Sequence, residues 1–258
     1  PIEPLMRLLL SNDDGIMARG LAALERAASP LGEVYVVAPD REQSATSHSL
    51  TMHHPLRPVQ IEERRWQVDG TPTDCVMLAI EALLPERPDF VLSGVNHGPN
   101  MGEDVLYSGT VAAAMEGLAL GVPAIAFSFA GGVLRADSLL DEHVPTIERI
   151  LRHIMSFPTF PDSTLLNINI PPVAADAVKG VRLTRLGRRV YSDSLTKMKD
   201  PWGRPIYWIG GGSVSWKESS ADSDFQAIAD GFVSITPLHL DLTNRDILDT
   251  AEQWWRPL

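Results

Sequence analysis

The chain has 258 residues, of which 44% are apolar, enough to bury the core of one large domain. Its net charge of −11 argues against a nucleic-acid polymer or an anionic membrane surface as a partner, since both attract basic patches. A single cysteine, Cys75, excludes an internal disulfide, and no stretch resembles a signal peptide or a membrane-spanning run. We therefore expect a cytoplasmic protein. A small anionic substrate stays compatible with this charge if a cation or backbone N–H groups receive it.

Strand and helix patterns alternate along the first part of the chain. Residues 6–11 form a nearly continuous apolar run, typical of a strand buried on both faces. Residues 18–29 then show helical spacing that ends before Pro30. Further strands are predicted at 34–38, 89–94, 124–129 and 164–170, further helices at 73–84, 109–120 and 137–155, and an edge β-hairpin within 50–68. This alternation predicts a three-layer α/β/α fold around a mainly parallel sheet.

The character of the sequence changes after about residue 186. Residues 188–216 mix aromatic, charged and glycine residues without a helical period, and five of the six tryptophans lie beyond residue 200. We divide the chain into an α/β catalytic domain, 1–186, and a C-terminal arm and tail, 187–258, which returns in part to the core. An aromatic segment with little core of its own usually packs against a second subunit. A long hairpin folded back on its own domain is the alternative.

Polar residues, with one glycine among them, follow three of the predicted strands, and the carboxyl edge of a parallel sheet is where ligands bind. They are Asn12, Asp13, Asp14 and Gly15 after the first strand, Asp40, Arg41 and Ser44 after the second, and Asn96 after the strand at 89–94. Two carboxylates, a hydroxyl and an amide oxygen suit Mg²⁺ or Mn²⁺. Zinc fits less well, because the seven histidines show no HxH or HxxxH spacing. The alternative is that Asp13 and Asp14 only cap the following helix.

The segment YSGTVAAAMEG gives a second signal. Ser108, Gly109 and Thr110 stand where a helix of small residues begins, and free N–H groups at such a start form an anion site. Plain N-capping by Ser108 is the alternative. The preceding loop NHGPNMG is costly to order unless it has a function, and its Asn100 could donate to a phosphate oxygen. No GxGxxG, GxxxxGK[ST] or GxSxG motif is present, so a metal site beside an anion-binding helix start predicts phosphate chemistry.

Seven blocks of sequence, in order, resemble the SurE family of nucleotidases, also called survival proteins. They are LLLSNDDGI, VVAPDREQSATSHSLT, GTPTDCV, SGVNHGPNMGEDVLYSGTVAAAMEG, GVPAIAFS, LNINIP and GFVSITPLHLDLT, spanning residues 6 to about 243. Any one block is weak evidence, but the ordered set is specific. The resemblance implies a Rossmann-like α/β domain with a swapped C-terminal arm, a β-hairpin extension that builds homodimers or homotetramers.

The resemblance also implies a divalent-metal-dependent phosphatase acting on nucleoside 5′- and 3′-monophosphates, with some members trimming short polyphosphate. We expect one Mg²⁺ or Mn²⁺ ion per subunit. The family's metal ligands fall on Asp13, Asp14, Ser44 and Asn96, and its phosphate contacts fall around Asn100, Ser108, Gly109 and Thr110.

For the mechanism, we expect a cation held by Asp13 and Asp14 to polarise a phosphoryl oxygen and to position an attacking water. One of these aspartates would accept the proton, while Asn96 and Asn100 orient the phosphate. A phosphoaspartyl intermediate is the less favoured alternative, because a carboxylate engaged by a metal is a poorer nucleophile. His48 could protonate the leaving oxygen, although a histidine that stabilises its turn is the simpler interpretation.

Two hypotheses of other classes stay open from the sequence. The chain could be a metal- and nucleotide-binding sensor without turnover. It could also be an oligomeric scaffold held by its tryptophan-rich arm, in which the two carboxylates are only helix caps.

Overall fold

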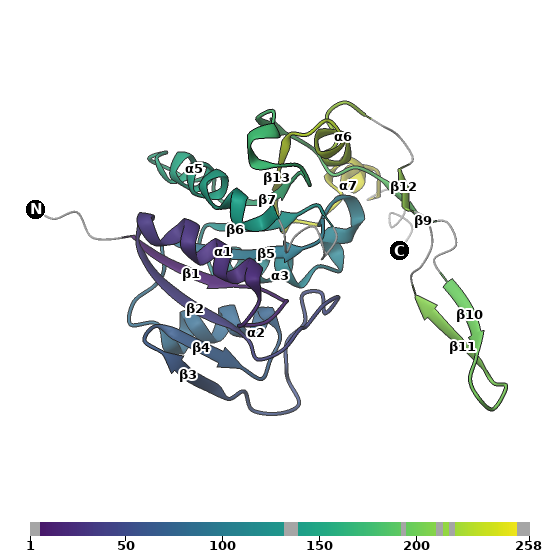
Figure 1. Cartoon of the computed structure of the whole chain (residues 1–258), viewed down its shortest axis with the longest axis horizontal. Coiled ribbons are helices and arrows are strands. Elements are labelled where there is room, and N and C mark those ends of the chain that lie inside the picture. The colour runs from purple at the N-terminus through teal and green to yellow at the C-terminus, as the bar shows by residue number, and fades with distance from the viewer. Residues whose placement is uncertain (1–5, 132–138, 192–194, 210–213, 217–219, 252–258) are drawn as a thin grey trace, which may run out of the picture.

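Nine strands form one sheet in the order β3-β4-β2-β1-β5-β6-β7-β13-β8 (Figure 1). The structure is a computed structural model that describes residues 6–131, 139–191, 195–209, 214–216 and 220–251. The strands are β1 (Arg7–Ser11), β2 (Glu33–Pro39), β3 (Pro58–Glu62), β4 (Arg65–Val68), β5 (Phe90–His97), β6 (Ala124–Phe129), β7 (Leu165–Ile170), β8 (Val181–Leu183) and β13 (Val233–Leu238). All neighbouring pairs are parallel except β3 with β4 and β13 with β7. The predicted mainly parallel sheet and its edge hairpin are confirmed.

Helices cover both faces of this sheet, as side-chain alternation along its strands requires. On one face Leu8 and Leu10 of β1 pack in a core shared with α1 (Arg19–Ala28) and α5 (Val144–Met155). On the other face Leu9 lies in a second core with α2 (Pro72–Leu78) and α3 (Gly109–Ala119). The remaining helices are α6 (Asp224–Ala229) and α7 (Leu248–Ala251), with short helical turns at Ser29–Leu31, Ala79–Leu83, Gly102–Leu106, Leu140–His143, Ala175–Ala177 and Arg245–Ile247. The expected three-layer arrangement is present.

Three predicted elements differ in extent from those observed. The helix expected at 73–84 ends as α2 at Leu78 and continues as a π-helical turn. The long helix expected at 137–155 begins, within the described residues, as a separate 3₁₀ turn, and α5 follows with Pro145 in its first turn. The strand expected to end at Gly94 runs on to His97, because a register shift between Ser93 and Asn96 lets β5 continue beside β6.

The C-terminal part of the chain both leaves the sheet and returns to it. The strands β10 (Leu195–Lys199) and β11 (Pro205–Ile209) form an antiparallel hairpin that projects away from the sheet (Figure 1). Two further strands, β9 (Arg189–Tyr191) and β12 (Val214–Trp216), pair with each other. The predicted C-terminal hairpin is therefore present, and β13 takes a place inside the sheet beside β7. Within the described residues, no helix has the length and apolar character needed to cross a membrane.

Candidate functional site

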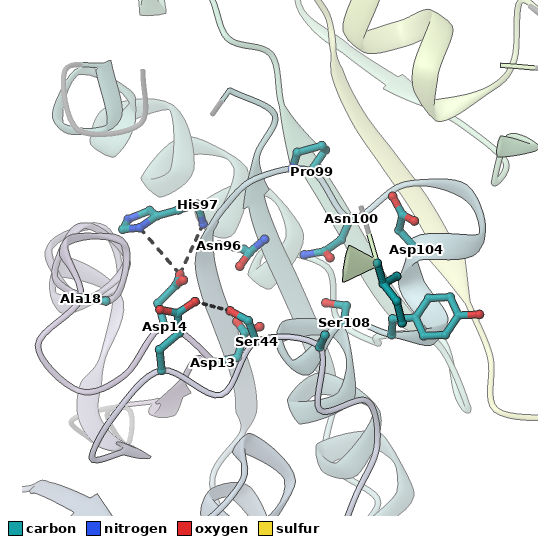
Figure 2. Close-up of a pocket in the computed structure, with 14 residues that line it drawn as sticks. Asp13, Asp14, Ala18, Ser44, Asn96, His97, Pro99, Asn100, Asp104 and Ser108 are labelled. Atoms are coloured by element: carbon teal, nitrogen blue, oxygen red, sulfur yellow. Dashed lines mark hydrogen bonds and ion pairs between the residues drawn. The ribbon is translucent and has the colours of Figure 1, made fainter. Parts of the chain in front are cut away.

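A cavity of about 1040 Å³ opens at the carboxyl edge of the parallel strands, where the loops after β1, β2 and β5 meet the start of α3 (Figure 2). Six residues predicted from sequence line it together: Asp13, Asp14, Ser44, Asn96, Asn100 and Ser108. Gly109 and Thr110 stand directly behind the wall without lining it. The edge of the sheet thus collects side chains that lie more than ninety positions apart in sequence.

The loops after β1 and β2 are tied to each other by backbone hydrogen bonds. The Ile16 N–H donates to the Pro39 carbonyl at 2.8 Å, and the Gln43 N–H donates to the Asp13 carbonyl at 2.7 Å. Gly15 adopts a φ of +99° and passes so close to the second loop that a Cβ there would lie 3.2 Å from the Arg41 carbonyl carbon. This contact brings the loop that carries Ser44 alongside the two aspartates.

Asp13 is 5% exposed and is held by the first turn of α3. The Thr110 hydroxyl donates to Asp13 Oδ1, and a Cβ on Gly109 would lie only 2.7 Å from Asp13 Cβ. The pKa of the Asp13 carboxyl is raised to about 6, mainly by burial and also by the charges of Asp14 and Glu42, while the Thr110 hydrogen bond opposes this shift. A buried carboxylate in this position is costly unless a cation compensates it.

Asp14 stands beside Asp13 and faces His97. Its Oδ2 accepts the His97 backbone N–H at 3.3 Å and lies 4.0 Å from His97 Nδ1 (Figure 2). Burial raises the pKa of Asp14 and the Glu42 charge adds to this, whereas His97 opposes it. Two neighbouring carboxylates that both resist ionisation mark a position suited to a positive ion.

The donor set fits a hard divalent cation. Asn96 donates its Nδ2 to the Gly98 carbonyl at 2.8 Å, which leaves its side-chain oxygen on the side of the two aspartates (Figure 2). Ser44 adds a hydroxyl oxygen at the same cavity. In the described part of the chain no group of three or more His, Cys, Asp and Glu side chains could hold a metal. A cation here would therefore depend on two carboxylates plus neutral oxygens, as Mg²⁺ and Mn²⁺ accept.

Asn100 is held by four hydrogen bonds that the sequence analysis did not anticipate. Its backbone N–H donates to Asn169 Oδ1 at 2.9 Å, and its carbonyl accepts from Asn169 Nδ2 at 3.0 Å and from Asn167 Nδ2 at 2.8 Å. Its side-chain Nδ2 donates to Ser128 Oγ at 2.8 Å. The spacing of Asn167 and Asn169, two apart on a buried strand, puts both on one face and was an available signal.

Two predicted roles meet competing contacts. Ser108 accepts the Val111 N–H at 3.0 Å as the N-cap of α3, so the capping interpretation holds and its own hydroxyl hydrogen is left for another acceptor. His48 Nε2 lies 2.7 Å from Oε2 of the buried Glu116 and does not line the cavity. This contact ties the Ser44 loop to α3, which agrees with a histidine that stabilises its turn.

The fold and the cavity define an α/β protein with an acidic, oxygen-lined site at the carboxyl edge of its sheet, beside a helix N-terminus. The family model described as Survival protein SurE matches residues 8–193. The chain therefore belongs to the SurE family.

Relatives and solved structures match along almost the whole chain. A protein from Gemmatimonas aurantiaca named 5′-nucleotidase SurE is 72% identical over 251 residues, which cover 97% of this chain and 99% of that protein. A protein of the same name from Geotalea uraniireducens is 47% identical over 249 residues, covering 96% and 99%. The crystal structure of the SurE protein from Aquifex aeolicus is 41% identical, with a TM-score of 0.84, and covers 96% of this chain and 99% of that chain.

Proposed function

We propose that this chain is a nucleotidase, a phosphatase that hydrolyses nucleoside 5′-monophosphates to nucleoside and phosphate. The names of its relatives support the activity. The observation that carries the proposal is that Asp13, Asp14, Ser44, Asn96 and the N-cap of α3 line one and the same cavity. Activity on 3′-monophosphates and on short polyphosphate is a further part of the proposal, which rests on the family resemblance.

In this proposal the enzyme requires one divalent ion per subunit, Mg²⁺ or Mn²⁺, held by Asp13, Asp14, Ser44 and Asn96. When bound, such an ion supplies a Lewis acid for a phosphoryl oxygen and acidifies a water. Two observations support this site. The pKa values of Asp13 and Asp14 are raised, and a bound cation would stabilise their ionised forms. The Asn96 side chain uses its nitrogen on Gly98, so its oxygen is available to a cation.

The chain's own residues then bind and orient the phosphate. In this proposal the Ser108 hydroxyl and the backbone N–H groups of Gly109 and Thr110, at the positive end of α3, donate to the phosphate. Asn100 uses one amide hydrogen on Ser128 and has a second for a phosphate oxygen. The Thr110 side chain is committed to Asp13, so we assign its phosphate contact to the backbone N–H alone. One of the two aspartates accepts the proton of the attacking water.

Phosphate release from AMP tests this proposal. We expect turnover with Mn²⁺ or Mg²⁺, loss of turnover in EDTA, and recovery when the metal is restored. A panel with 3′-AMP and short polyphosphate, run in parallel with Mg²⁺, Mn²⁺ and Zn²⁺, defines the substrate range. Stabilisation of the fold by metal and AMP without any phosphate release would instead identify a sensor. Hydrolysis in H₂¹⁸O that labels an aspartate would replace direct water attack with a phosphoaspartyl intermediate.

We also propose that the chain assembles as a homodimer or homotetramer through its C-terminal arm, with exchange of the arm between subunits. The described hairpin supports this, because Leu195, Met198, Trp202, Tyr207, Trp208 and Ile209 are all exposed on it. In this proposal residues 1–186 are the catalytic domain and 187–258 the arm and tail. A cytoplasmic location agrees with a sequence that has one cysteine.

A further inference from the structure

The loop after β2 contributes a carboxylate that no sequence motif singled out. The Ser44 hydroxyl donates to Glu42 Oε1 at 2.6 Å, the length of a charge-assisted O–H···O⁻ hydrogen bond. The neighbouring Arg41 donates instead to Asp40, with Nε 2.9 Å from Oδ1. Glu42 thus lines the cavity and accepts the hydrogen bond of Ser44. Arg41 is paired with Asp40 and not with Glu42.

Glu42 also belongs to the electrostatic surroundings of both aspartates. Its charge contributes to the raised pKa of Asp13 and to that of Asp14. Among the described residues that line the cavity, Asp104 is a further acid and there is neither a lysine nor an arginine. A divalent ion at Asp13 and Asp14 would thus interact with at least one more negative charge than its two carboxylate ligands provide.

We propose that Glu42 is a positioning residue for Ser44 and a third negative charge that strengthens cation binding, an inference that rests on the metal site of the proposed function. A serine hydroxyl can donate one hydrogen and can offer its lone pairs elsewhere. When the hydrogen goes to Glu42, the lone pairs are free to face a cation. Without Glu42, the same hydrogen could turn toward Asp13 or Asp14, which line the same cavity, and such a hydrogen bond would occupy a serine and a carboxylate that the cation needs. Partners behind metal ligands commonly act in this way.

The charge of Glu42 acts with opposite sign on the two ligands of the site. It attracts a divalent cation and repels a phosphate dianion. Removing the charge should therefore weaken metal binding and, at saturating metal, tighten binding of the nucleotide. A residue that only holds the loop together would weaken both.

Isothermal titration of Mn²⁺ into the metal-stripped full chain separates these effects. We expect Glu42→Gln to bind Mn²⁺ roughly tenfold more weakly, because it loses the charge but can still accept from Ser44. Glu42→Ala also loses the hydrogen bond, so its affinity should fall by up to about 100-fold. In a Ser44→Ala background the Gln and Ala variants should differ by less than about twofold, since no hydroxyl is left to position.

Two controls accompany the titration. Asp104→Asn removes a carboxylate from the same cavity whose charge, unlike that of Glu42, is not a main cause of the raised pKa values of Asp13 and Asp14, so Mn²⁺ affinity should stay within about twofold. With AMP at saturating Mn²⁺, Glu42→Gln should lower KM by roughly two- to fivefold and leave kcat within about twofold.

Wild-type Mn²⁺ affinity in Glu42→Ala would overturn this inference alone. So would a stoichiometry of two ions in the wild type and one in Glu42→Ala, because Glu42 would then be a direct ligand of a second ion. A wild-type chain that binds no Mn²⁺ would overturn the metal site of the proposed function together with this inference.

Discussion

At the scale of single residues, Asp13 shows how this site holds charge. The carboxyl is almost fully buried, accepts a hydrogen bond from Thr110 and lies beside the acids Asp14 and Glu42. Burial and like charges favour its protonated form, and a bound cation would favour its ionised form. The metal-free chain should therefore be less stable at neutral pH than the same chain without this charge.

We expect Asp13→Asn to abolish phosphate release and to stabilise the metal-free chain above pH 6. The pKa of Asp13 is about 6 in the fold against an ordinary value of 3.8, so between these values the folded chain retains a proton that the unfolded chain has lost. Stability of the wild type therefore falls as pH rises through this window, by up to about 3 kcal/mol, whereas asparagine cannot ionise. Its Oδ1 can still accept from Thr110.

Urea unfolding in EDTA at pH 5 and pH 7.5 checks this prediction. The variant should gain on the wild type at both pH values, and its gain at pH 5 should be about half of that at pH 7.5, because pH 5 lies in the middle of the titration window. An advantage of equal size at both pH values would contradict the assigned titration, and a loss of stability at pH 7.5 would contradict the burial argument.

At the scale of elements, the position of the first turn of α3 depends on the absence of a side chain at Gly109. Gly109 lets the first turn approach Asp13 so closely that a Cβ would lie 2.7 Å from Asp13 Cβ. Alanine is a better helix former than glycine by as much as about 1 kcal/mol in a helix interior, so helix propensity alone would favour replacing it. The position is therefore explained by contact with the site and not by the helix.

We expect Gly109→Ala to lower the rate of AMP hydrolysis by about 100-fold, because a shift of Asp13 on the order of 1 Å is enough for such a loss. The matched control is Gly117→Ala in the same helix, where a Cβ would meet Val91 Cγ2 at 2.7 Å instead. That variant should lose stability in urea while keeping its Mn²⁺ affinity. Equal Mn²⁺ affinity in Gly109→Ala and the wild type would refute the role of the close approach.

The extents of the elements show which local signals suffice. The strand at 124–129 is observed with the predicted bounds, because a short apolar run between glycine- or proline-containing turns indicates a buried strand. The continuation of β5 through Gly94 to His97 was not predicted, since glycine usually ends a strand pattern. Its conformation is set by β6: a Cβ on Gly94 would lie 2.2 Å from the Phe127 carbonyl oxygen.

At the scale of the whole molecule, the C-terminal segment supports the loop that carries Asn100. Asp224, at the start of α6, accepts the Gly102 N–H at 2.8 Å through Oδ2 and the Gly187 N–H at 2.9 Å through Oδ1. Gly102 lies two residues after Asn100 in the glycine-rich loop, so this buried carboxyl binds a residue more than a hundred positions away in sequence. Within the described residues, the sequence composition changes near residue 186, but residues after that point pack against the α/β domain.

We expect replacement of the hairpin, residues 195–209, by a short Gly-Ser loop to lower the oligomeric mass measured by light scattering. The apolar side chains exposed on β10 and β11 are the surface that assembly would bury. Trp208→Asp, which keeps the hairpin, serves as the matched variant and should shift the mass in the same direction. An unchanged mass in both would contradict assembly through the arm.

The sequence by itself determined the class of fold, the edge of the sheet at which the cavity lies and six of the residues that line it, because apolar periodicity defines strands and parallel strands share a carboxyl edge. Only the tertiary structure decided how these side chains are used. Thr110 holds Asp13, Glu42 accepts from Ser44, and the two β7 asparagines grip Asn100. Such pairings depend on distances between loops far apart in the chain, and no local pattern encodes those distances.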